Sequence, residues 1–191
     1  MALTIWLGLD AQIQFISPAE FNSELQHVRE LAVHTKKGGR LAYLSFQDEG
    51  QVSPAQLFDE FQSKLGMSEG LTFRLRSQST DQLAYDHRRY NQFYNGYKIE
   101  MAWLNLHLKD NKVNALNGDF VHNANFDLNI NITEQQALDA ALRTVGASVY
   151  KWQLPSEEQH LRLETNDPQA TYMPNAEMSL LNESLDLNKR L

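Results

Sequence analysis

The sequence contains no cysteine in its 191 residues. Disulfide bridges, thiolate nucleophiles and cysteine-ligated zinc sites are therefore excluded. This absence leaves secretion open, because a chain of this length can bury a substantial core without covalent crosslinks.

Positive charge is scarce as well, with 17 Lys and Arg against 24 Asp and Glu, a formal net charge of −7. Proteins that bind nucleic acid usually carry a basic stripe. Here the compact basic groups are only Lys36-Lys37 with Arg40, and Arg88-Arg89. The composition argues against a nucleic-acid partner, and the acidity indicates solubility.

Long hydrophobic runs are missing too. The apolar stretch Leu3–Leu9 is too short to span a bilayer, so no membrane partner is expected for this chain. It fits the remnant of a signal peptide or, equally well, a short strand or a disordered start.

The familiar catalytic motifs are absent from the sequence. There is no His-Glu-x-x-His, no Gly-x-Ser-x-Gly elbow and no Gly-rich phosphate loop. We interpret the six histidines as solvated or core residues, and the acid pairs Asp48/Glu49 and Glu157/Glu158 as parts of solvated loops. These histidines are His27, His34, His87, His107, His122 and His160. No catalytic residue, metal ligand or cofactor is predicted for this segment.

Before residue 40 the sequence predicts few well-defined secondary-structure elements. Apolar residues at roughly helical spacing favour a loosely held helix or a mobile lead-in over 13–39, ending at Gly38-Gly39. Residues 40–46 read as a strand. Ser53, Pro54 and Gln56 form the start of a capped helix that Gly66 ends. Its expected apolar face consists of Leu57, Phe58, Phe61 and Leu65.

A β-meander follows this helix. Strands are predicted at 71–76, 83–94, 97–108 and 113–116, with a polar turn at 77–82. Asn95-Gly96 is a strong hairpin signal, because both central residues of a type I′ turn need positive φ. Alternation along the third strand places Ile99 and Trp103 on one face and Leu104 on the other. Apolar residues on both faces predict that the sheet is covered on both sides there.

The last third predicts a smaller module. Thr133 and Gln136 form a second capping box, and Gly146 ends the helix. Short strands are expected afterwards at 149–154, 161–164, 171–173 and 178–181. The fold class is therefore α+β: an antiparallel meander curved around a helix, then a small module of one helix and strands.

The stretch 85–118 resembles the propeptides of thermolysin- and fungalysin-type zinc peptidases. Those propeptides carry a strand of the form His-x-Arg-Tyr-x-Gln-x-Tyr-x-Gly and a later Asn-Gly. The matching residues here are His87, Arg89, Tyr90, Gln92, Tyr94, Gly96, Asn117 and Gly118. Tyr97-Lys98-Ile99 departs from the family's usual apolar-Pro-apolar triplet. The helix at 133–146 with Tyr150-Lys151-Trp152 resembles the PepSY-type (cystatin-like) module that follows in such propeptides.

This resemblance implies three segments. Residues 1–39 would be a lead-in, 40–125 a propeptide domain of the fungalysin/thermolysin type, and 126–191 a PepSY-like module expected to be incomplete at its C-terminus. The chain would then be the N-terminal propeptide of a secreted or periplasmic, bacterial zinc metallopeptidase precursor. It would act as an intramolecular chaperone and inhibitor, with zinc bound only by the peptidase domain.

The resemblance also implies a partner, the cognate catalytic domain of the same precursor. The family-motif residues above, together with Trp103, are the candidate contacts. Tyr, Trp and Arg are the residue types that usually dominate protein interfaces. Read without the family, Asp86–Arg89 would be a solvated strand face with Tyr85, Tyr90 and Tyr94 as packing residues.

Two other readings stay open. The chain could be a stand-alone binding or protease-inhibitor module without an attached peptidase. It could also be a small enzyme that uses carboxylates or His87 as acid and base, although nothing in the sequence selects a substrate.

Overall fold

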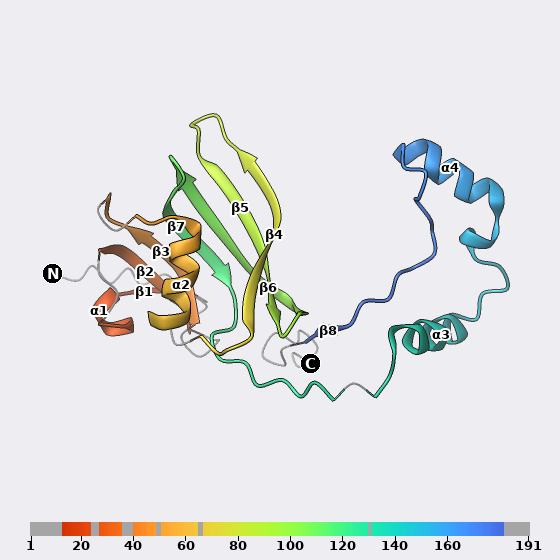
Figure 1. Ribbon diagram of the computed structural model, residues 1–191, viewed down its shortest axis with the longest axis horizontal. Coiled ribbons are helices and arrows are strands. Elements are labelled where there is room, and N and C mark those ends of the chain that lie inside the picture. Colours follow the sequence, from red (N-terminus) through yellow and green to blue (C-terminus); the bar gives the residue numbers. More distant parts are fainter. Residues whose placement is uncertain are drawn as a thin grey trace. The chain divides into compact units, whose positions relative to one another are not determined.

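The computed structural model describes residues 13–23, 27–35, 40–48, 51–64, 67–129 and 131–181 (Figure 1). The chain divides into two compact units. The first consists of residues up to Phe126 together with the segment from Ser179 onward, and the second is Asp127–Met178. The apolar run 3–9 lies outside the described residues.

An eight-stranded sheet forms the first unit. Its main path runs β1 (Ile13–Ile16), β2 (Val28–His34), β3 (Arg40–Phe46), β7 (Lys112–Asp119), β6 (Tyr97–Lys109), β5 (Asp86–Tyr94) and β4 (Leu71–Thr80), and all these pairings are antiparallel. β8 (Ser179–Leu180) pairs with β6 in parallel, within the strand expected at 178–181. Because β7 lies between β3 and β6, the N-terminal strands and the meander share one sheet.

The prediction of a helix within 13–39 is wrong. This stretch contains β1, the four-residue helix α1 (Pro18–Phe21) and β2. Val28 and Leu31 are both buried although they are three residues apart, because the pairing with β3 slips between Val28 and Glu30. A bulge of this kind reproduces helical spacing within a strand. The glycines at 38–39 lie outside the described residues.

The meander is confirmed, with different strand ends. Asn95 and Gly96 have φ of 47° and 89°, and the next turn, Asp110-Asn111, has φ of 53° and 59°. β4 extends to Thr80, so the turn predicted at 77–82 is too early. β5 begins only at Asp86, because the Asp81 carboxylate accepts the N–H groups of Leu83 and Tyr85 and holds this segment in the turn.

The capped helix is confirmed as α2 (Pro54–Lys64). The Ser53 N–H donates to Gln56 Oε1 at 3.0 Å, and the Gln56 N–H donates to Ser53 Oγ at 3.4 Å. Leu57 is buried, and the Phe58 ring stacks on Phe73 and meets Tyr90 edge-on. This helix therefore covers the core face of the sheet. Leu65 and Gly66, and the side chain of Phe61, lie outside the described part.

The alternation predicted for β6 is interrupted. Met101 has φ of 62°, and the pairing with β5 moves from Phe93↔Lys98 to Asn91↔Trp103. Between these two pairs β5 advances by two residues and β6 by five, so β6 contains three extra residues that have no partner in β5. Ile99 consequently joins Ala102 and Leu104 in the core, and Trp103 is half-buried on the opposite face. The expectation that Ile99 and Trp103 share a face is wrong.

The second unit is helical over its described residues. α3 (Glu134–Val145) has the predicted capping box, and Gly146 ends it in the left-handed conformation. The strand expected at 149–154 is instead the short 3-10 helix η3 (Lys151–Gln153). The strand expected at 161–164 lies inside α4 (Pro155–Thr165), and 171–173 forms no strand. A PepSY-type arrangement of helix and strands is therefore not confirmed.

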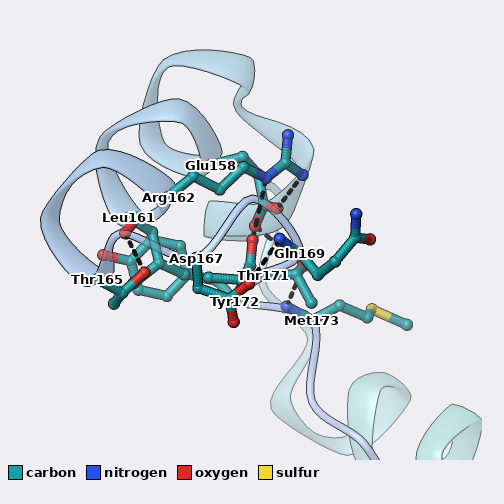
Figure 2. A network of polar contacts seen from close by, with 10 residues as sticks. Glu158, Leu161, Arg162, Thr165, Asp167, Gln169, Thr171, Tyr172 and Met173 are labelled. Carbon is teal, nitrogen blue, oxygen red and sulfur yellow. Dashed lines mark hydrogen bonds and ion pairs between the residues drawn. The ribbon is translucent and has the colours of Figure 1, made fainter.

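A buried carboxylate organises the end of this unit (Figure 2). Glu158, in α4, accepts the Tyr172 N–H at 2.8 Å and the Thr171 hydroxyl at 3.2 Å. Arg162 pairs with the same carboxylate at 3.2 Å. Glu158 is thus a structural residue that ties the 171–173 segment to α4, and not part of a solvated acidic loop.

Candidate docking surface

One face of β5, β6 and β7 is polar, and we call it the polar face. The strand register determines which of its residues are neighbours. Between β5 and β6, His87 lies opposite His107 and Arg89 lies opposite Asn105. Between β6 and β7, Asn105 lies opposite Asn117. Its members come from all three strands: His87, Arg89, Asn91, Trp103, Asn105, His107 and Asn117. Neighbouring strand positions point to the buried core instead, because side chains alternate between the two faces.

A chain of hydrogen bonds crosses this polar face. His87 Nε2 lies 3.0 Å from Asp81 Oδ2, and His87 Nδ1 lies 2.8 Å from His107 Nδ1. His107 Nε2 lies 2.8 Å from Asn117 Oδ1. The chain connects the β4–β5 turn with β5, β6 and β7. It also links two residues of the sequence motif, His87 and Asn117, through a residue that the motif does not contain.

Asp81 is the acidic end of this chain. The hydrogen bond from His87 holds the pKa of Asp81 below its ordinary value, and hydrogen bonds from the Tyr85 and Leu83 N–H groups act in the same direction. Asp81 is therefore a carboxylate at neutral pH, and it can only accept hydrogen bonds.

Arg89 and Trp103 form the adjoining part of the polar face. Arg89 Nε donates to Asn105 Oδ1 at 3.1 Å, and its guanidinium lies 5.9 Å from the centre of the Trp103 ring. Arg89 is exposed and Trp103 is half-buried. A planar cation beside an indole ring, both reachable from solvent, is an arrangement that protein interfaces favour.

Two motif residues that the resemblance made candidate contacts lie on the core side of the sheet. Tyr90 is 7% exposed and packs against Phe58, and burial raises the pKa of its hydroxyl. Gln92 is fully buried. Its amide donates to the Val121 carbonyl at 2.7 Å and accepts the Val121 N–H at 2.8 Å. Gln92 therefore fills the irregular region opposite the extra residues of β6.

The remaining motif residues have structural settings of their own. The Tyr94 ring packs against Phe126, with 5.7 Å between centres. Gly96 occupies the turn position with φ of 89°. Gly118 lies so close to β6 that a Cβ would come within 2.5 Å of the Trp103 carbonyl oxygen. In the Asn-Gly of the motif, Asn117 therefore lies on the polar face, and Gly118 allows β6 and β7 to approach each other closely.

Three members of the polar face were not among the contacts predicted from the sequence: Asn91, Asn105 and His107. Asp81, which ends the hydrogen-bond chain, was not predicted either. Counting back from the Asn95-Gly96 turn without a bulge would place His87 opposite Leu104. Because β6 contains three extra residues, His87 instead lies opposite His107. A Met in a strand gives no local signal for such an insertion, and the polar residues alternating with leucines along 104–108 were the only available hint.

Within the described ranges, no three His, Asp or Glu side chains converge as a metal site. The helices described are also too short or too polar to cross a membrane.

A known family model matches the same strands. Residues 72–120 match the Fungalysin/Thermolysin Propeptide Motif. The matched segment begins in β4, includes β5, β6 and β7, and ends at Phe120. The propeptide motif therefore coincides with the strands that carry the polar face, and the resemblance noted in the sequence is confirmed over this segment. A search of curated proteins found no match.

Proposed function

We propose that this chain is the N-terminal propeptide of a thermolysin-like zinc metallopeptidase precursor. It would be an intramolecular chaperone and inhibitor of the peptidase domain, secreted or periplasmic and bacterial, and without catalytic residues of its own. Zinc would be bound by the peptidase domain alone. The observation that carries the proposal is the coincidence of the propeptide motif with the strands of the polar face.

The physical basis of the chaperone role is selective binding. A segment that binds the folded peptidase and not the unfolded chain stabilises the fold by mass action. Covalent connection raises the effective concentration of the segment to about the millimolar range. A weak docking surface can therefore act strongly within a precursor and dissociate once the connection is cut.

Arg89 and Trp103 are the best candidates for the central contact on this surface. Both are accessible from solvent, and each can bury a large area when a partner arrives. His87 and Asn117 lie beside them and would form polar contacts. Tyr90, Gln92, Tyr94, Gly96 and Gly118 would then support the surface without touching the partner.

The test uses the purified 191-residue chain and the mature peptidase of its own precursor. We expect the chain to slow cleavage of a peptide substrate and to raise the yield of refolded peptidase. Arg89→Ala and Trp103→Ala should each weaken inhibition by about tenfold or more, as interface hot spots do. Arg29→Ala, an exposed arginine on β2, is the matched control and should leave inhibition unchanged.

Two results would count against the proposal. The first is a folded chain that neither slows proteolysis nor assists refolding. The second is a loss of inhibition that is equal for Arg29→Ala and Arg89→Ala. Reading the coding sequence downstream of Leu191 separates the proposal from a stand-alone inhibitor module, since the precursor requires a following His-Glu-x-x-His helix.

A further inference from the structure

Two arginines of the sheet unit each lie over an aromatic ring on the same side of the sheet. The Arg74 guanidinium, from β4, lies 4.2 Å from the centre of the Phe93 ring. The Arg89 guanidinium lies 5.9 Å from the centre of the Trp103 ring. A guanidinium held against an aromatic ring still presents the N–H groups along its edge. Both cations are therefore oriented before a partner arrives.

The strand register brings the two pairs together around Asn91. Along β5, Arg89 and Phe93 lie two residues before and two residues after Asn91, so the three side chains point to the same face. Across the strands, Asn91 lies opposite Arg74 of β4 and opposite Trp103 of β6. We call these five residues the arginine–aromatic patch. It extends the polar face onto β4, with both arginines exposed and the other three residues half-buried.

The charge of this patch is opposite to the formal net charge of the chain, which is −7. Among the described residues, neither Arg74 nor Arg89 has a carboxylate partner. Lys98, which lies opposite Phe93, is already paired with Glu100 at 3.0 Å. The two arginines are therefore positive charges that no described side chain neutralises.

The two arginines also have N–H groups available for a partner. Arginine carries five N–H groups, and Arg89 uses the one on Nε to donate to Asn105 Oδ1 at 3.1 Å. Arg74 donates no side-chain hydrogen bond to the described residues. The remaining N–H groups of each guanidinium fit a carboxylate, which accepts two parallel hydrogen bonds. The Asn91 amide between them can both donate and accept.

We propose that the arginine–aromatic patch binds carboxylate side chains, so that an acidic segment of the peptidase domain occupies the polar face. The assignment to the peptidase domain rests on the proposed function, whereas the preference for carboxylates comes from the patch itself. The arginines pair with the carboxylates, and the two rings cover the aliphatic parts of the acidic side chains. Nucleic acid fits less well, because the acidic remainder of the chain repels a dense array of phosphates.

The test uses the free, full chain and two synthetic peptides, hexaglutamate and hexaglutamine, in NMR titrations at neutral pH. We expect hexaglutamate to bind with a dissociation constant of about 1 mM or below. It should shift the signals of the Trp103 indole N–H, the Asn91 amide and the Arg89 Nε–H, whereas hexaglutamine should shift none of them. Raising the salt concentration from about 0.05 M to about 0.5 M should weaken the binding about tenfold, because salt screens exposed charges.

Variants show whether these two arginines are responsible. Arg74→Gln and Arg89→Gln should each weaken hexaglutamate binding about threefold to tenfold, and the double variant should weaken it further. The control is a double variant of Arg29→Gln and Arg143→Gln, which removes the same charge at exposed positions on β2 and α3. This control should bind hexaglutamate as the unmodified chain does. All four side chains are exposed, so both double variants should keep the thermal midpoint of the unmodified chain.

Three results would overturn this assignment. The first is the absence of shifts at about 10 mM hexaglutamate. The second is an equal loss of binding in both double variants, which would mean that net charge alone attracts the peptide. The third is equal or tighter binding at the same residues by a short single-stranded DNA or by vesicles containing phosphatidylserine, which would make phosphate the preferred group. Because no peptidase is used, a chain that inhibits its peptidase but does not bind hexaglutamate contradicts only the acidic partner.

Discussion

His122 lies between the rings of Phe120 and Phe21, with 5.1 Å and 6.5 Å between ring centres. Burial lowers its pKa to about 4, and the positive charge of Arg40 acts in the same direction. Arg40 itself pairs with Asp119 at 3.0 Å. His122 is therefore neutral in the folded protein at pH 7.

This shift makes stability depend on pH. The folded-state pKa of about 4 lies below the ordinary value of 6.5, so the unfolded chain binds the proton more tightly. The contribution of His122 is complete above about pH 6.5 and is lost as the pH falls towards 4. We expect the free energy of unfolding to drop by about 2–3 kcal/mol over this range, as measured by urea denaturation.

A matched pair of variants isolates the effect. His122→Phe removes the titrating group but keeps an aromatic ring, so most of this pH dependence should disappear. His160→Gln changes an exposed histidine and should leave the slope as it was. A slope that is the same in all three proteins would show that His122 does not cause it.

Gln92 gives a second prediction for a single residue. Its amide satisfies both backbone groups of Val121 in a fully buried position. Gln92→Leu should leave that N–H and C=O without partners and cost about 2–4 kcal/mol of unfolding free energy. Asn91→Ala, on the neighbouring polar face, should stay within about 0.5 kcal/mol. Equal effects in urea denaturation would mean that the Val121 contacts are not important for stability.

At the level of elements, β6 and β7 approach closely at Gly118. A Cβ there would lie 2.5 Å from the Trp103 carbonyl oxygen and 3.2 Å from Leu104 Cα. Both are backbone atoms and cannot move aside alone. Gly118→Ala should therefore cost about 1–3 kcal/mol, with a thermal midpoint lower by about 2–4 °C for each kcal/mol. Ser79→Ala on exposed β4 is the control, and an unchanged midpoint for Gly118→Ala would contradict the close approach.

Elements with local signals could be predicted from the sequence. The caps at Ser53 and Thr133 and the turn at Asn95-Gly96 depend on residues within four positions of one another. Such contacts are visible in the sequence because they form the same way in many folds. α4 had local signals as well, in Pro155 and Asn166, but the alternating leucines at 161 and 163 favoured a strand.

Bulges could not be predicted, and they account for the larger errors. The slip near Val28 made a strand look helical, and the insertion at Met101 changed which residues of β6 face the core. Both depend on pairing with a strand that is distant in the sequence. The same insertion hid the pairing of His87 with His107. The motif therefore identified His87, Arg89 and Asn117 on the polar face, whereas Asn105 and His107, which lie between them on β6, were not predicted as contacts.

The whole molecule consists of two units with unequal cores. The sheet unit buries a continuous cluster that includes Leu31, Leu104 and Leu116 at 0% exposure. In the second unit α3 has no buried residue, and the buried residue of α4 is Glu158. Hydrophobic burial, the main source of stability, is therefore concentrated in the sheet.

This difference predicts separate stabilities in hydrogen exchange of the full chain. Amides of α3 and α4 should exchange on the order of 100-fold faster than those at the centres of β6 and β7, because opening a helix with little buried surface requires less free energy. β3 should exchange as slowly as β6 and is the internal control. Equal protection of the helices and the sheet would mean that the two units unfold together, and that α3 and α4 are stabilised by burial that their own residues do not supply.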